Sequence, residues 1–311
     1  MSDIRTNMFA TRNPTFEWTT ALEILRGAYA KSTIDAYYRD FCIFVQWCDK
    51  FGFTPLPSKA FTVAKFLDDQ SLTKAPATVR RYGVSVGKIH RLLDLDDPTS
   101  FEMVKLALRR AHRSASVPQR QSMGLTRENV NEIVGLSHRS VRHLRDATMI
   151  SVGFDAVARR SEIVNIRVSD VQIVNLASGR VLIRRSKTDQ ICRGRWAYLT
   201  ETTSELVLRW LEKTANNEFL FGPVYREHVI DRILDPVTVQ RSVRRAISEI
   251  GLNEARKYTG HALRVGAAQE LLKMGRSSSD IMRAGGWRSM ASVSRYLEAA
   301  GHNVWLESAK P

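Results

Sequence analysis

Apolar side chains recur at intervals of three and four residues along most of this 311-residue chain, and this period restricts the fold to a mainly helical one. The clearest example begins near Ser32, a candidate N-cap, and ends near Gly52. Its apolar face is formed by Ile34, Tyr37, Phe41, Val45 and Cys48. Further helices are expected over about 63–70, 78–93 and 101–113. The first part of the chain is therefore predicted to be a small helical bundle.

A polar stretch interrupts the helical pattern after this bundle. Residues 114–126 read SASVPQRQSMGLT, contain a proline and a glycine, and show no apolar period, which is typical of a linker. We therefore expect an N-terminal helical domain over 1–118, a linker over 119–126 and a second domain over 127–311.

The second domain is mostly helical by pattern, with one strand-rich interruption. Residues 179–185 (GRVLIRR) and 195–199 (RWAYL) have strand character and flank a polar loop, 186–194. The predicted fold class is accordingly mainly α, with two domains and a small antiparallel β-sheet in the second.

The charge balance indicates what the protein binds. Basic residues outnumber acidic ones by 47 to 32, which gives a net charge of +15. Most of the basic residues are arginines, whose planar guanidinium group binds phosphate in a bidentate manner and stays charged at every relevant pH. Such a surplus favours a polyanionic partner, most simply nucleic acid, and a solvated basic surface is the ordinary alternative.

Other classes of site and location find little support in the sequence. No stretch approaches the roughly 20 apolar residues of a membrane-spanning helix, and the polar N-terminus has no signal-peptide core. The cysteines Cys42, Cys48 and Cys192 are scattered and form neither a disulfide framework nor a zinc-ligand pattern. We therefore expect a cytoplasmic protein without membrane contact, metal or cofactor.

Two pairs of polar residues are candidates for chemistry. His261 and Arg264 stand three apart at the start of a predicted helix, where free N–H groups and a partial positive charge suit a phosphate. Arg159 and Glu162 have the same spacing further upstream. Taken alone, the first pair is more often a surface feature and the second an ordinary helical ion pair.

Three further residues complete the candidate set. Tyr296 follows Trp287 by nine residues on a predicted helix, and Lys187 stands at the tip of the predicted hairpin. Alone, a tyrosine on an amphipathic helix is usually a core residue, and a hairpin lysine is usually solvated.

Together, these residues occur in an order and spacing that resemble the tyrosine recombinase (phage integrase) family, closest to Cre-type site-specific recombinases. The resemblance covers nearly the whole chain, although in the N-terminal domain it is one of helix pattern only. It rests on Arg-x-x-Glu-Ile (159–163), Ile-Arg-Val-x-Asp-Val (166–171), Arg-Ser-Lys-Thr (185–188), Gly-His-Ala-Leu-Arg-Val-Gly-Ala-Ala (260–268) and Ile-Met-Arg-Ala-Gly-Gly-Trp (281–287).

The resemblance implies a DNA strand-transferase, a site-specific recombinase that cleaves and rejoins duplex DNA through a covalent 3′-phosphotyrosine, without metal or ATP. It implies that Tyr296 is the nucleophile and that Arg159 and Arg264 clamp the phosphate, where preorganised donors meet the developing charge. His261 and the Trp287 indole would add donors, and His261 is also a plausible base for the phenol.

Two more catalytic roles follow from the same resemblance. Lys187 is similar to the family's general acid, which protonates the leaving 5′-hydroxyl. Glu162 matches the supporting acidic residue that orients the arginine and the histidine.

The resemblance also suggests which residues contact DNA. In the N-terminal domain the candidates are Thr78 and Arg81, and also Tyr37 and Tyr82, although the helical phase favours a core position for the two tyrosines. In the second domain the candidates lie on one predicted helix, with a phosphate-only role equally open for the last of them: Gln240, Arg241 and Arg244.

The resemblance implies a homotetramer that acts on two DNA duplexes and passes through a Holliday junction. It also implies a monomer or weak oligomer when the protein is free of DNA. Residues 297–311 keep an apolar set that fits either docking on a neighbouring protomer or packing on the same domain. The alternatives are a type IB topoisomerase-like or telomere-resolving strand transferase, or a non-catalytic DNA-binding protein. The sequence does not indicate the target site or the biological task.

Overall fold

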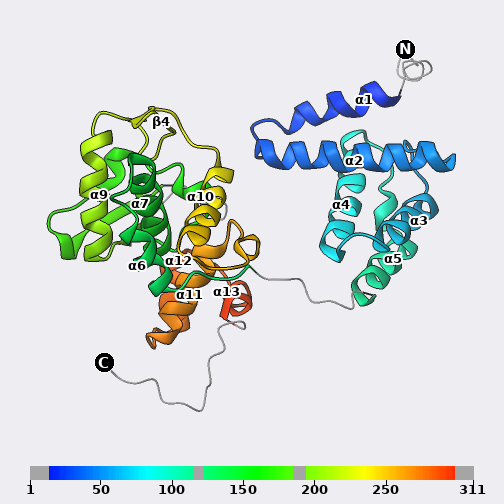
Figure 1. Cartoon of the computed structure of the whole chain (residues 1–311). Coiled ribbons are helices and arrows are strands. Elements are labelled where there is room, and N and C mark those ends of the chain that lie inside the picture. Colours follow the sequence, from blue (N-terminus) through cyan, green and yellow to red (C-terminus); the bar gives the residue numbers. More distant parts are fainter. Residues whose placement is uncertain (1–13, 115–121, 185–193, 298–311) are drawn as a thin grey trace. The chain divides into compact units, whose positions relative to one another are not determined.

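The structure is a computed structural model that describes residues 14–114, 122–184 and 194–297. It divides into two compact units, Met1–Arg120 and Gln121–Pro311, each with its own hydrophobic core (Figure 1). No helix within these described ranges is long and apolar enough to cross a membrane.

The described part of the first unit is entirely helical, as its apolar period predicts. Its elements are α1 (Pro14–Ala21), the 3-10 helix η1 (Leu22–Leu25), α2 (Lys31–Phe51), α3 (Ala60–Ser71), α4 (Pro76–Leu92), the 3-10 helix η2 (Pro98–Ser100) and α5 (Glu102–Arg113). The α2 helix starts one residue before the predicted cap, because Ala30 rather than Ser32 holds the N-cap position. It ends at Gly52, which adopts the left-handed conformation (φ 69°) that an L side chain rarely adopts.

Aromatic side chains form the core of this bundle. Phe41, Phe44 and Phe66 are fully buried, and the rings of Phe44 and Phe66 meet edge to face with centroids 5.0 Å apart. Tyr82 is buried in the same cluster and Tyr37 packs at its margin, which agrees with the core positions that their helical phase favours.

The second unit surrounds α7 with helices and carries a small sheet. Its helices are α6 (Arg127–Gly135), α7 (Val141–Asp155), α8 (Arg160–Ile163), α9 (Glu201–Thr214), α10 (Pro236–Glu249), α11 (Ala262–Lys273), α12 (Ser278–Gly285) and α13 (Met290–Leu297). Its strands are β1 (Val171–Gln172), β2 (Arg180–Ile183), β3 (Arg195–Tyr198), β4 (Val224–Tyr225) and β5 (His228–Val229), and its 3-10 helices are η3 (Val168–Asp170), η4 (Leu176–Ser178) and η5 (Ala255–Lys257).

The predicted antiparallel hairpin is present. β2 pairs with β3 so that Ile183 faces Arg195 and Val181 faces Ala197, and β1 adds a third antiparallel strand beside β2. The two-residue strands β1, β4 and β5 were not predicted from the sequence, because strands of that length show no alternation of apolar and polar residues. The mainly helical fold with a small antiparallel sheet is thus confirmed.

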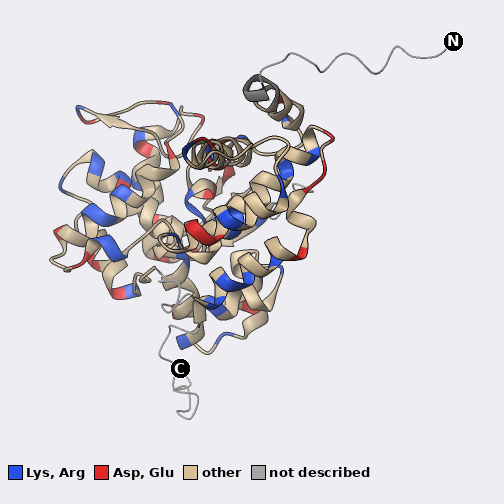
Figure 2. Cartoon of the chain, turned by 90° about the vertical axis from the view of Figure 1, so that its right-hand side faces the viewer, with Lys and Arg blue, Asp and Glu red and all other residues tan. Residues whose placement is uncertain are grey.

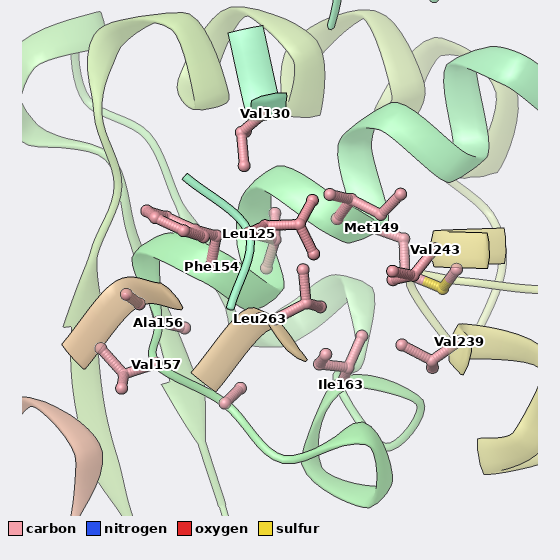
Figure 3. Packing of buried hydrophobic residues seen from close by; sticks show 14 of the residues in the cluster. Leu125, Val130, Met149, Phe154, Ala156, Val157, Ile163, Val239, Val243 and Leu263 are labelled. Carbon is pink, nitrogen blue, oxygen red and sulfur yellow. The ribbon is translucent and has the colours of Figure 1, made fainter. Parts of the chain in front are cut away.

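The core of the second unit is built on α7, whose residues from 144 to 154 are all buried. Met149 and Phe154 of this helix belong to the same buried cluster as Leu263 of α11 and Ile163 of α8 (Figure 3). This packing fixes the ends of three helices relative to one another, and the candidate catalytic residues lie at those ends.

Residues 122–126, which the sequence places in the linker, belong to the second unit and pack against its helices. The N–H groups of Met123 and Leu125 donate to the carbonyls of Lys257 (3.2 Å) and Ala262 (3.2 Å), and Leu125 is buried. The close approach depends on Gly266 of α11, because a Cβ there would lie 1.8 Å from the Leu125 carbonyl oxygen. A single apolar anchor in a polar segment thus carries this part of the chain into the core.

We predict that Gly266→Ala destabilises the second unit, since the added methyl group overlaps backbone that cannot move without breaking these hydrogen bonds. Overpacking of this kind costs about 1–3 kcal/mol of the free energy of unfolding, measured by urea denaturation. The control is Gly135→Ala at the end of α6, where a Cβ meets no atom within 4 Å and stability should be kept or slightly raised. Equal stability of the two variants would contradict the proposed packing.

Candidate active site

The site is organised by the turn that follows α7. Val157 has a φ of 49°, an unfavourable conformation for a β-branched residue, and this bend directs two successive carbonyls toward guanidinium groups. The Ala156 carbonyl accepts from Arg195 Nη2 (2.7 Å), and the Val157 carbonyl accepts from Arg264 Nη1 (2.6 Å). Arg159 lies two residues after Val157, so the turn sets the direction in which the Arg159 side chain leaves the backbone.

Arg159 is held by Glu162, one turn further along α8. The buried carboxylate of Glu162 accepts from Arg159 Nη1 (2.6 Å) through one oxygen and from the Arg159 backbone N–H (3.0 Å) through the other. The same carboxylate therefore caps the short helix and orients the guanidinium group.

Arg264 is among the largest fully buried side chains of the described structure. Its guanidinium carbon lies 3.7 Å from the ring centre of Trp287, and its Nε and Nη2 have no protein partner. Burial, followed by the nearby charge of Arg159, lowers the pKa of Arg264 to about 10, so the group is still charged at neutral pH. Buried N–H donors without acceptors are costly, and a bound anion is the ligand that would satisfy them.

Trp287 and Tyr296 extend this cluster from the C-terminal helices. Gly286 ends α12 in the left-handed conformation (φ 63°), and the next residue, Trp287, donates its N–H to the Met282 carbonyl (2.9 Å). The Tyr296 ring of α13 lies 5.5 Å from the Trp287 ring, and Gln269 Nε2 donates to the Tyr296 carbonyl (3.1 Å). The Trp287 indole thus contacts both the Arg264 guanidinium group and the Tyr296 ring.

His261 stands at the N-cap of α11, on the exposed side of the site. Desolvation, followed by the charges of Arg264, Arg160 and Arg159, lowers the pKa of His261 below its ordinary value of 6.5. The imidazole is therefore neutral at neutral pH and has one nitrogen that can accept a proton.

The structure brings together the predicted catalytic residues that it describes: Arg159, Glu162, His261, Arg264, Trp287 and Tyr296. Lys187 lies outside the described residues. Arg195, the first residue of β3, belongs to the same cluster and was missed, because one more arginine in a basic chain carries no motif.

The predicted DNA-reading residues of the first unit lie on α4. Arg81 forms a bidentate pair with the buried carboxylate of Asp40 (Nε–Oδ2 2.7 Å, Nη2–Oδ1 2.8 Å), which also accepts from Ser85 Oγ (3.0 Å). The Arg81 side chain remains half-exposed, so its orientation is fixed at the surface. Thr78 is partly buried near the start of the same helix.

The predicted contacts of the second unit lie on α10. Arg241 is exposed, and Gln240 Oε1 accepts from Arg160 Nη1 (3.3 Å). Arg244 instead donates to the carbonyls of Tyr258 (3.1 Å) and Arg256 (3.2 Å), so it braces the segment that leads to His261. Lysine and arginine residues are distributed over helices of both units, with acidic residues among them (Figure 2).

A cluster of guanidinium groups beside a tyrosine, on a mainly helical scaffold, is chemically suited to bind an anion such as a phosphate. Residues 124–302 match the model of the Phage integrase family. Because this match covers more than half of the sequence, the chain belongs to the phage integrase family, the tyrosine recombinases. The members of this family are DNA strand-transferring enzymes of site-specific recombination, and this chain is therefore an enzyme of that class.

Individual relatives agree with the family assignment. The chain is 25% identical to an integrase/recombinase xerD homolog of Selenomonas ruminantium, over 98% of this chain and 94% of the relative. It is 26% identical to the recombinase cre of Escherichia phage P1, over 72% of this chain and 71% of that protein.

Solved structures share the fold. XerH site-specific recombinase bound to difH substrate has a TM-score of 0.64 at 17% identity, covering 97% of this chain and 91% of that one. A lambda integrase(75-356) dimer bound to a COC' core site has a TM-score of 0.62 at 18% identity, covering 93% and 96%.

We predict that the pKa of His261 lies below 6.5 in a nuclear magnetic resonance titration of its imidazole signal, identified by its loss in His261→Gln. Arg160→Gln should move this pKa upward, because it removes one of the positive charges that oppose protonation. Arg180→Gln, on β2 with its side chain over Trp196, serves as the control and should leave it unchanged. A His261 pKa above 6.5 would contradict the described electrostatics.

Proposed function

We propose that this protein performs site-specific recombination by cleaving and rejoining duplex DNA through a covalent 3′-phosphotyrosine at Tyr296. One observation carries the proposal: Arg264 is buried with two unpartnered N–H donors, stacks on Trp287 and interacts electrostatically with Arg159, Glu162 and Tyr296. Such a site is prepared for an anion and places a phenol close to it.

The proposed reaction is a displacement at phosphorus. The Tyr296 oxygen forms a bond to the scissile phosphorus while the bond to the 5′-oxygen breaks, and negative charge develops on the non-bridging oxygens. Arg159 and Arg264 stabilise that charge, since preorganised donors in a partly dry site act strongly on a transition state. The Trp287 ring holds the face of Arg264 and so limits its movement.

Two proton transfers complete the proposed chemistry. The neutral imidazole of His261 is suited to accept the phenolic proton, and its lowered pKa keeps it neutral for that purpose. Lys187 is proposed to donate a proton to the leaving 5′-oxygen. The phosphotyrosine bond retains the free energy of the broken phosphodiester, so attack by a 5′-hydroxyl rejoins DNA in a reaction that needs neither ATP nor, given the guanidinium charges, a metal.

The proposed assembly on DNA is a tetramer that joins two duplexes and passes through a Holliday junction. It is supported by the similarity of fold to a lambda integrase tetramer bound to a Holliday junction (TM-score 0.62, 17% identity). We propose that residues 297–311, most of which lie outside the described residues, dock on the neighbouring protomer and close a cyclic assembly. Thr78, Arg81, Gln240 and Arg241 remain the proposed DNA contacts, and Arg244 serves at least to brace its own unit.

We predict that Tyr296→Phe abolishes covalent capture of DNA and leaves DNA binding within about twofold of wild type, since only the nucleophile is lost. The substrate is a nicked duplex that carries the site selected by the wild-type protein from a random DNA library, and the adduct is measured by denaturing electrophoresis.

Tyr225→Phe is the matched control, because this tyrosine is exposed on β4, away from the described guanidinium cluster. A Tyr296→Phe protein that still forms adduct at the wild-type rate would exclude the assignment. Supercoiled DNA with two copies of the site separates the recombinase from a topoisomerase-like enzyme, because recombination exchanges the flanking segments and relaxation does not.

A further inference from the structure

A third guanidinium group lies within the site, and the proposed mechanism has not used it. Arg195 begins β3, and only 17% of its side chain is exposed. Its Nη2 donates to the Ala156 carbonyl (2.7 Å) and lies 3.7 Å from Glu162 Oε2, whereas its Nη1 is buried without a protein partner. The Arg195 guanidinium group therefore contacts two features that orient Arg159, namely the turn after α7 and the carboxylate of Glu162.

The first element is the strained turn after α7. Arg195 and Arg264 donate to consecutive carbonyls, those of Ala156 and Val157, and together they hold the turn on both sides of its positive φ angle. Without the Arg195 bond, the Ala156 carbonyl has no described partner outside helix α7, and one side of the turn can relax. Arg159 lies three residues after Ala156, so a relaxed turn would change the direction of its side chain.

The second element is the carboxylate of Glu162. One of its oxygens accepts from the Arg159 guanidinium group, and the other accepts from the Arg159 backbone N–H and lies closest to Arg195. Arg195 thus approaches the carboxylate from the side that caps α8. It limits rotation of the group that fixes Arg159.

The third element is the end of α12. The space next to Gly286 is occupied by Arg195, whose Cδ and Nε would each lie 3.4 Å from a Cβ at that position. Gly286 directly precedes Trp287, which stacks on Arg264. One side chain of β3 therefore contacts the segments before both Arg159 and Trp287.

The environment of Arg195 indicates that this side chain adds little to the stability of the fold. A buried N–H without a partner costs free energy, and the pKa of Arg195 is lowered, first by burial and then by the like charge of Arg159. Replacing a buried ion by an apolar side chain of similar volume is often neutral or stabilising, provided that no charge is left unpaired. Glu162 would keep Arg159 as its partner.

We propose that Arg195 is a positioning residue of the strand-transfer site, which fixes the Ala156–Arg159 turn and Glu162 so that Arg159 stays directed at the scissile phosphate. The inference rests on the proposed function. Its consequence is that Arg195 contributes to the rate of cleavage and little to folding or DNA binding.

The test compares Arg195→Met and Arg195→Lys with wild type on the selected nicked duplex, with enzyme in excess. Because a misplacement of about 1 Å can cost about 100-fold in rate, Arg195→Met should form adduct roughly 10- to 100-fold more slowly. Its Kd for the duplex should stay within about threefold and its Tm should not fall, because removing a buried charge with an unpartnered Nη1 offsets the loss of the hydrogen bond to the Ala156 carbonyl. Arg195→Lys should recover part of the rate, since one ammonium group can reach the carbonyl but not also the carboxylate.

The control is Arg180→Met, an arginine of the adjacent strand β2 that stacks on Trp196 and should cleave at the wild-type rate. A double-mutant cycle with Glu162→Gln adds a second readout, and the two losses should be less than additive because both residues act through Arg159. Cleavage by Arg195→Met within twofold of wild type, a rate loss matched by losses of Tm or binding, or fully additive losses would each overturn the inference. Absence of adduct with the wild-type protein would instead overturn the proposed function, and the inference with it.

Discussion

The site depends on one electrostatic constraint, which is that three guanidinium groups are held together around a single carboxylate. Arg159, Arg195 and Arg264 repel one another, and the pKa values of Arg195 and Arg264 are lowered first by burial and further by these like charges. Glu162 offsets only part of this charge. An anion in the site would offset the remaining positive charge, and this is the physical basis of the proposal that the site binds the scissile phosphate.

The free-energy cost of burying these like charges is offset by apolar packing in the core of the second unit. α7 is buried over most of its length, and its apolar contacts with α8 and α11 fix the positions from which the arginines project (Figure 3). The strained Val157 persists because the guanidinium groups bind the carbonyls on both sides of its φ angle while the preceding helix cannot shift. The apolar core therefore supplies the stability of this unit, and it holds in place a polar cluster that would not form alone.

The sequence predicts those features that depend on local patterns or on a motif. The apolar period places α2 to α5, and the strand character of 179–185 and 195–199 places β2 and β3. The order of residues in a family motif predicts the cluster around Arg264. Pairings between distant segments leave no local pattern, so the Asp40–Arg81 pair, the brace formed by Arg244 and the position of Arg195 become visible only in the fold. Residues 122–126 look like a linker for the same reason, since one leucine hardly changes the polar composition of the segment, although that leucine is buried.

The arginines and the tyrosine of the proposed reaction are anchored to the core to different extents. The arginines project from elements that are anchored in the core, whereas Tyr296 lies on an eight-residue helix of which only Val293 is fully buried. Elements with few buried contacts open at lower free energy than core elements. The proposed phosphate-binding groups therefore keep their geometry while the phenol has freedom to approach and to withdraw. That division suits the proposed reaction, in which Tyr296 first attacks a phosphate and later leaves it, because the charge stabilisation has to remain in place through both steps.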